Sequence, residues 1–195
     1  MNYINLSILA GLASVVYGLF LSQKILKLPT GTPDMNYIAL AISQGASAFL
    51  KRQYQTIGVL SVGMFVLLGF TLGWMSAFAF ALGATFSAIA GFIGMNIAVR
   101  ANIRTAQAAK SGLAQALSVA FSGGAVTGLM VAGLALVSVS VMYFILTITS
   151  GAGLDLKPLV ALGFGGSLIS VFARLGGGIY TKGADVGTDM VGKIE

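Results

Sequence analysis

The sequence predicts an all-α, polytopic transmembrane helix bundle. Hydrophobic residues make up 57% of the 195 residues and charged residues only 8%, and the apolar stretches are long enough to cross a bilayer. The chain has no cysteine and no histidine, which excludes disulfides, Cys/His zinc sites and Ser-His or Cys-His catalytic pairs. Its net charge of +6 is explained by membrane topology, because the cations lie between apolar stretches, so we expect no nucleic-acid partner.

Five membrane spans are expected, at residues 4–21, 57–75, 77–99, 125–147 and 159–180. The first span lacks the basic start and the cleavage site of a signal peptide, so it is expected to be a retained helix. Before the second span, Thr32-Pro33-Asp34 is typical of a helix start. The helix over 35–55 is expected to protrude from the membrane or to lie at its surface, since Lys51 and Arg52 keep it out of lipid.

Small residues recur every four positions on the third span, which follows a tight, uncharged turn at residues 73–76. They are Gly83, Ser87 and Gly91. Small residues at this spacing let helices approach closely in lipid, so this span is expected to pack within a bundle. A loop is expected to follow it, with the cations Arg100, Arg104 and Lys110.

The fourth span has a second small-residue face, formed by Gly124, Gly128 and Ala132. Its helix is expected to begin near residue 113 and to kink at 122–124, where Ser-Gly-Gly interrupts the apolar run. A Gly-containing loop at 149–157 then precedes Pro158, which suits the first turn of the fifth helix.

Lysine and arginine positions predict that the N-terminus lies outside the cell. The connections on one side of the membrane hold seven of these cations: Lys24, Lys27, Lys51, Arg52, Arg100, Arg104 and Lys110. The opposite side holds only Lys157. Because lysine and arginine accumulate in cytoplasmic loops, the seven-cation side is expected in the cytoplasm. With five spans, the segment 181–195 is then cytoplasmic too.

Segment 174–195 is rich in charge, with three of the five acidic and three of the eleven basic residues. On one continuous helix, five of these would share a narrow face: Arg174, Lys182, Asp185, Asp189 and Lys193. Two carboxylates one turn apart repel each other, and a Mg²⁺ ion between them would remove that cost. The lysines on either side of the pair suggest an anion that carries the metal, such as a phosphate. A salt-bridged helix end at the membrane surface explains the same charges about equally well.

Longer blocks of the sequence resemble a known family. The run GGGIYTKGADVGTDMVGK at 176–193 is similar to the signature of the membrane-bound, ion-translocating inorganic pyrophosphatases, whose usual form is GGGIYTKAADVGADLVGK. The blocks at 42–57, 91–109 and 116–129 resemble the second, third and fourth helices of this family, in its order. Three positions depart from the usual pattern: Gln44 replaces Glu, and Gly183 and Thr188 replace alanines.

The resemblance implies a pump that hydrolyses Mg-pyrophosphate at the cytoplasmic face and moves H⁺ or Na⁺ across the membrane. The short connection between the first two helices favours the plasma membrane over an internal acidic compartment. The resemblance also implies a homodimer with about sixteen transmembrane helices per subunit, Mg²⁺ as cofactor and a K⁺ requirement that is left open. Carried over by position, Lys182 contacts pyrophosphate, and Asp185 and Asp189 hold Mg²⁺. Arg174 matches the arginine at the ion gate, and Lys193 matches a signature lysine of uncertain role.

With about five helices, the chain is expected to be the N-terminal fragment of a longer protein and to be inactive alone. Two carboxylates cannot hold several magnesium ions and a tetra-anion by themselves. Two other classes remain open on the residues alone. One is a transporter or channel fragment with no enzymatic activity, and the other is a membrane assembly subunit whose charged helix end is structural.

Overall fold

Five long helices make up most of the part of the chain that the structure describes. This computed structural model describes residues 2–149, 153 and 155–194, and the side chains of all these except 2, 169, 171–177, 179 and 180. The helices are α1 (Asn2–Leu26), α2 (Pro33–Leu72), α3 (Trp74–Ala109), α4 (Leu113–Thr149) and α5 (Lys157–Val191). No strand occurs among the described residues, so the predicted all-α class is confirmed.

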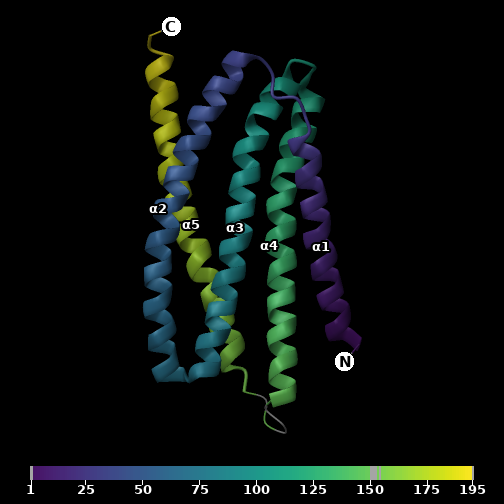
Figure 1. The fold of residues 1–195 in the computed structure, drawn as a ribbon, viewed down its shortest axis with the longest axis vertical. Helices are drawn as coiled ribbons and strands as arrows, with labels where there is room; N and C mark the ends of the chain where they lie inside the picture. The colour runs from purple at the N-terminus through teal and green to yellow at the C-terminus, as the bar shows by residue number, and fades with distance from the viewer. Residues whose placement is uncertain (1, 150–152, 154, 195) are drawn as a thin grey trace.

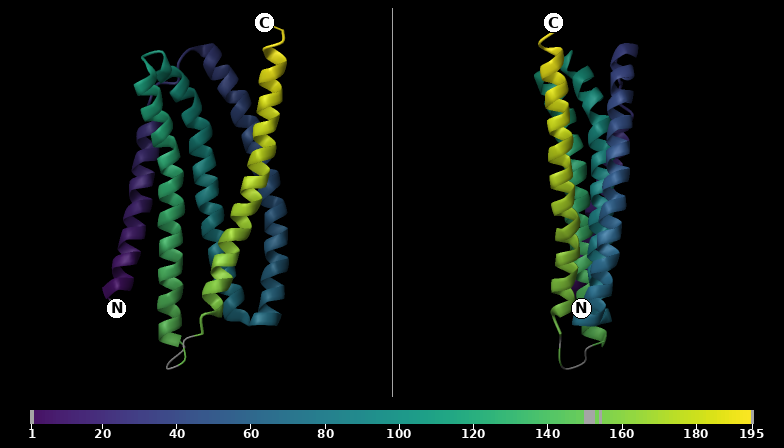
Figure 2. Two further views of the ribbon diagram at one scale, coloured as in Figure 1. Left: turned by 180° about the vertical axis from the view of Figure 1, so that it is seen from behind. Right: turned by 90° about the vertical axis from the view of Figure 1, so that its left-hand side faces the viewer.

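The helices run up and down, side by side, in an elongated bundle (Figure 1). Helix α3 is central and packs against α2, α4 and α5, while α1 packs mainly against α4. We call the end with residues 27–32, 110–112 and 181–194 the upper end, as it is drawn in Figure 1. In the side view of Figure 2, the upper part of α5 stands apart from α2.

Four of the helices are long and apolar enough to cross a membrane: α2, α3, α4 and residues Tyr3–Leu26 of α1. Large apolar side chains cover their outer faces, as at Val59 and Phe70, which are 76% and 79% exposed. Such surface is stable only in lipid or against further protein. The prediction of a polytopic membrane protein is therefore confirmed, whereas the boundaries of the individual spans remain predictions.

The start of α2 is built as its sequence predicts. Thr32 Oγ1 accepts a hydrogen bond from the backbone N–H of Met35 at 3.4 Å, and Pro33 occupies the first helical position. Asp34 lies in the first turn, where its charge favours the positive end of the helix dipole. Because no proline or turn interrupts it, α2 continues to Leu72, and the expected protruding stretch and second span form one helix.

Two expected connections are wrong in extent. Arg100 and Arg104 lie on α3 and not in a loop, because the alanine-rich stretch up to Ala109 contains no helix breaker. Helix α3 ends at Ala109, and the turn that follows contains Gly112, whose φ of +131° suits glycine. The expected turn at 73–76 is reduced to Gly73 alone, with φ of +90°, since α3 already begins at Trp74.

Helix α4 uses a different small-residue face from the predicted one. Gly124 and Gly128 have open space where a Cβ would stand, whereas Gly123 meets Ala101 of α3 and Gly133 meets α1. Helix α4 also continues through 122–124 without interruption. The largest buried cluster confirms the contact face, because it joins α4 to α1 and α3: Ile25, Ala90, Ile97, Ala101, Val126 and Met130.

Candidate functional site

The lower half of α5 is fixed by a close crossing with α3. A Cβ on Gly83 would clash with the carbonyl oxygen of Leu162, and one on Gly165 would clash with that of Phe80. Next to this contact, the Ser87 hydroxyl donates a hydrogen bond to the carbonyl oxygen of Gly166 at 3.0 Å. The predicted packing role of Gly83 and Ser87 is thus confirmed.

Gly91, the third member of that predicted face, contacts a different helix. A Cβ at this position would lie 3.1 Å from the hydroxyl of Tyr54 on α2. The Tyr54 hydroxyl donates to the carbonyl oxygen of Ala88 at 2.8 Å, which joins α2 to α3. The small residues of α3 therefore hold two neighbours, α5 lower down and α2 higher up.

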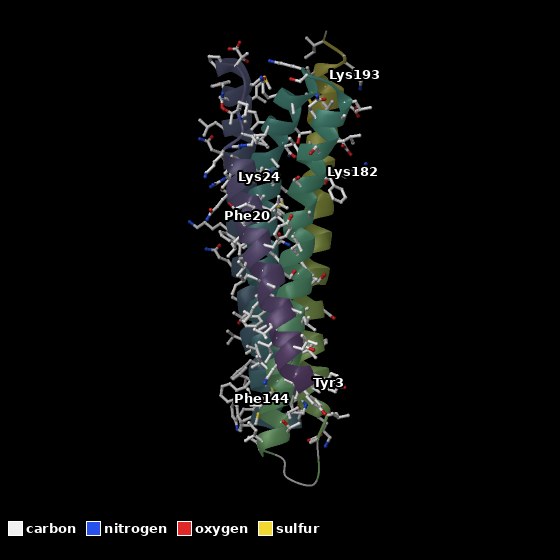
Figure 3. All side chains as sticks on the ribbon, turned by 90° about the vertical axis from the view of Figure 1, so that its right-hand side faces the viewer. Tyr3, Phe20, Lys24, Phe144, Lys182 and Lys193 are labelled. Atoms are coloured by element: carbon white, nitrogen blue, oxygen red, sulfur yellow. The ribbon has the colours of Figure 1, made fainter. Side chains whose placement is uncertain are left out.

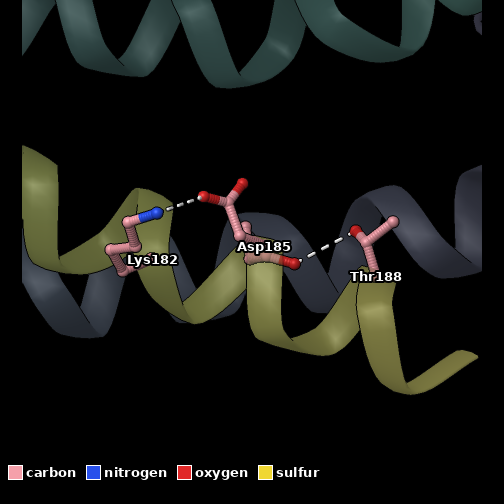
Figure 4. Close-up of polar contacts among 4 residues, drawn as sticks. Lys182, Asp185 and Thr188 are labelled. Atoms are coloured by element: carbon pink, nitrogen blue, oxygen red, sulfur yellow. Dashed lines mark hydrogen bonds and ion pairs between the residues drawn. The ribbon is translucent and has the colours of Figure 1, made fainter.

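Beyond the crossing, α5 continues as a helix into the charged segment. All residues from 181 to 194 are exposed, and Gly183 and Gly187 have nothing within 4 Å of an added Cβ. The Thr188 hydroxyl donates back to the carbonyl oxygen of Ala184 at 3.0 Å (Figure 4). The described helices therefore leave this segment uncovered, with its polar side chains directed outward.

Lys182 and Asp185 form the only ion pair among the residues that the structure describes. Lys182 Nζ lies 3.3 Å from an Asp185 carboxylate oxygen, one helical turn away, as Figure 4 shows. The two side chains are 82% and 54% exposed. Exposed ion pairs contribute little to stability because water screens them. The pair can consequently open at little cost when a ligand offers either group a better partner.

Asp189 and Lys193 differ in how well they fit the predicted face. Asp189 lies on α5 one turn after Asp185, is exposed, and forms no ion pair with any described residue. Lys193 lies beyond the helix, which ends at Val191, so its predicted place on the same helical face is wrong. The Gly192 N–H, just after this end, still donates to the Thr188 carbonyl oxygen at 3.0 Å.

Arg174 belongs to α5 by its backbone, two helical turns below Lys182, but its side chain lies outside the described residues. In Figure 3, Lys182 lies at about the height of Lys24 of α1, with Lys193 farther up and Tyr3 and Phe144 near the lower end. The charged segment 181–194 therefore lies at the same end of the bundle as the C-terminal end of α1.

The carboxylates suit a metal ion that arrives with its ligand. Among the described residues, no three Asp, Glu, His or Cys side chains gather into a metal-binding cluster. Mg²⁺ keeps several waters and is commonly held by one or two carboxylates plus substrate phosphates. Asp185 and Asp189, exposed and one turn apart, fit that mode of binding and do not form a complete protein cage.

Arg104 lies at this end, on α3 and not in the expected loop. Its Nη2 donates to the carbonyl oxygen of Leu26 at 2.9 Å, and its Nη1 donates to that of Arg100 at 2.6 Å. Its partner lies 78 positions away in the chain, so no local pattern could have indicated the contact. The arginine ties the end of α1 to α3.

Comparison with known proteins places the chain in a family. Residues 12–195 match the family model described as "Inorganic H+ pyrophosphatase". A "K(+)-insensitive pyrophosphate-energized proton pump" of Methanosarcina mazei is 52% identical over 189 residues, which cover 96% of this chain and 27% of the relative. A "Putative K(+)-stimulated pyrophosphate-energized sodium pump" of Clostridium tetani is 45% identical over 194 residues, covering 100% of this chain and 28% of the relative.

The match thus extends over almost the whole chain, while the chain spans little more than a quarter of the length of these relatives. The resemblance found in the signature at 176–193 is confirmed by a match that also includes helices α2, α3 and α4. The chain belongs to the family of the inorganic H⁺ pyrophosphatases.

Proposed function

We propose that the intact protein containing this chain hydrolyses pyrophosphate and uses the energy to move an ion across the membrane. The observation that carries the proposal is the exposed Lys182–Asp185–Asp189 row on α5, within a chain that matches the pump family from residue 12 to 195. The named relatives are pyrophosphate-energised pumps of protons or of sodium ions. Membership of this family favours the pump over a non-enzymatic transporter or an assembly subunit.

Each charged side chain of this row has a role in the proposal. The Lys182 ammonium binds a phosphate oxygen of pyrophosphate, and Asp185 and Asp189 hold Mg²⁺ that arrives with it. When bound, Mg²⁺ neutralises charge on the phosphate oxygens and lowers the pKa of coordinated water. The Lys182–Asp185 ion pair, 3.3 Å in length, opens so that the lysine faces the anion and the carboxylate faces the metal.

The proposed orientation puts the upper end in the cytoplasm and the start of α1 outside. Helices α2 and α3 contain 40 and 36 residues, about twice what a bilayer core requires. We assign their excess length to the upper end, because Arg100 and Arg104 on α3 are costly to place in lipid. The substrate segment 181–194 then faces the cytoplasm, across the plasma membrane from the N-terminus.

Coupling to the ion is assigned to Arg174, two turns below Lys182 on the same helix. In the proposed orientation Arg174 lies closer to the membrane centre than Lys182, where a charge without a partner is costly. A change of its partner can therefore bias an ion to move. The transported ion is H⁺ or Na⁺, with K⁺ as a further cation in some members, as the names of the relatives indicate. We propose a homodimer as the working unit.

The proposal is tested with the intact protein in sealed vesicles, by measuring Mg²⁺-dependent phosphate release from pyrophosphate. Asp185→Asn and Asp189→Asn, which keep the size of each side chain, should abolish release. The matched control is Asp34→Asn, an exposed carboxylate in the first turn of α2, which should retain release. Release that persists in both site variants would contradict the assignment.

The same vesicles identify the ion. A proton pump should generate a pH gradient that a protonophore collapses, whereas a sodium pump should accumulate Na⁺ even when a protonophore is present. Repeating the assay with and without K⁺ tests the cation requirement. Ion flux that continues without pyrophosphate would instead favour the non-enzymatic transporter.

A further inference from the structure

The reach of α5 beyond its crossing with α3 has a mechanical consequence. At 1.5 Å per residue, Asp185 lies about 28 Å along the helix from Gly166. A tilt of about 5° at the crossing would displace Asp185 by roughly 2.5 Å. Ligand-binding groups must be held within about 0.5 Å of their productive geometry, so the direction of α5 at the crossing matters to the site.

Among the described side chains of α5, those that pack into buried clusters lie below and at the crossing. Ala161 and Leu162 are buried, each 4% exposed, in clusters with residues of neighbouring helices. Leu168 is the last described residue of α5 that packs against a buried cluster. Above it, every described side chain is exposed. Among the described contacts of α5, those at its lower end are therefore the ones that can set its direction at the crossing.

Two features fix that direction. The reciprocal contact of Gly83 with Leu162 and of Gly165 with Phe80 leaves no room for a Cβ, so the two backbones touch. The Ser87 hydroxyl then fixes the rotation and depth of α5, because it donates to the carbonyl oxygen of one residue, Gly166. A hydrogen bond within lipid-embedded helices is directional, whereas apolar packing alone permits sliding.

We propose that Ser87 and the Gly83–Gly165 crossing are positioning elements that aim α5, and thereby place Lys182, Asp185 and Asp189 relative to the rest of the bundle. Ser87 touches none of these groups, so it acts only through the helix. The inference depends on the proposed function for its consequence in catalysis, but its geometric part does not.

The geometric test measures the distance between spin labels at Asn102 of α3 and Met190 of α5, both exposed. This chain has no cysteine, so the two introduced cysteines are the labelling sites within it. Any cysteines elsewhere in the intact protein are first replaced. Ser87→Ala should shift the distance distribution by about 2 Å or broaden it, and Ser87→Thr, which retains the hydroxyl, should restore it.

Gly165→Ala supplies a stronger perturbation, with Gly163→Ala as its matched control. An added Cβ clashes with Phe80 at residue 165 and meets nothing within 4 Å at residue 163. The first variant should displace α5 and the second should not. A folded Gly165→Ala protein and a Ser87→Ala protein that both keep the parent distance distribution would overturn the inference.

Kinetics separate this inference from the proposed function. Ser87→Ala should raise the KM for Mg-pyrophosphate by about tenfold, since a misplacement of an ångström can cost that much or more. Hydrolysis that continues with an unchanged distance and KM would overturn the positioning role and leave the pump intact. A shifted distance in a protein that neither binds nor hydrolyses pyrophosphate would overturn the proposed function and uphold the geometry.

Discussion

The guanidinium of Arg104 on α3 donates a hydrogen bond to the carbonyl oxygen of Leu26, the last residue of α1, at 2.9 Å. The last carbonyls of a helix lack partners within the helix, and a cation near them is favoured by the helix dipole. Arg104 thus satisfies a free carbonyl and places its charge where the field stabilises it. It joins two helices that otherwise share few contacts.

We predict that Arg104→Met will loosen the α1–α2 connection. Methionine keeps much of the apolar stem but removes both donors, at a cost of about 1.5–3 kcal/mol for a hydrogen bond to a charged group. Amide hydrogen exchange at residues 27–32 should become faster, and the thermal unfolding temperature should fall.

The matched control for Arg104 is Arg100→Met, four residues earlier on α3 and exposed. Its side chain bonds to no other helix among the described residues, so exchange at 27–32 should remain as in the parent. Equal exchange rates in the two variants would show that the Leu26 contact does not hold the connection.

The membrane helices were predictable because long apolar runs and helix signals such as Thr32-Pro33-Asp34 act locally. The charges after residue 99 predict a loop there, but Arg100 and Arg104 lie on α3 because arginine is a good helix former. The contact face of α4 was misplaced for a different reason. Lipid-facing and packed faces are equally apolar, so spacing shows that small residues recur but not which of them meet a neighbour.

The candidate site was predictable as far as one helix determines it. The spacing of Lys182, Asp185 and Asp189 predicts that they share one face of a helix, and all three lie on α5. Lys193 lies outside this row because the helix ends at Val191. The Ser87–Gly166 and Arg104–Leu26 bonds, 79 and 78 positions apart, arise only when the helices pack, so no local sequence pattern indicates them.

Lys182→Met should separate binding from stability. The side chain is 82% exposed and its ion pair is screened, so the thermal unfolding temperature should remain unchanged. The loss of an ammonium that contacts phosphate should raise the KM for Mg-pyrophosphate by about tenfold or more. Lys27→Met, an exposed lysine after α1, should change neither quantity. A lower unfolding temperature with an unchanged KM would assign Lys182 a structural role only.

Gly133→Ala should separate α1 from α4. A Cβ at residue 133 would lie 2.7 Å from the carbonyl oxygen of Gly11 and 2.8 Å from a methyl group of Val15. The helices must move apart, which typically costs about 1–3 kcal/mol. Gly128→Ala on the same helix meets open space, so the free energy of unfolding should stay the same or rise slightly. Equal loss of stability in both variants would show that the contact at Gly133 is not the cause.

Tyr54 and Gly91 should be energetically coupled. Tyr54→Phe removes the hydroxyl that donates to Ala88, at a cost of about 0.6 kcal/mol, typical of a hydrogen bond between membrane helices. Gly91→Ala should also destabilise, since its Cβ would press on that hydroxyl at 3.1 Å. In the double variant the hydroxyl is gone, so the alanine should cost less than it does alone. Additive losses in a double-mutant cycle of thermal unfolding would contradict the coupling. As the control, Tyr37→Phe, whose side chain is 77% exposed, should show no coupling to Gly91→Ala.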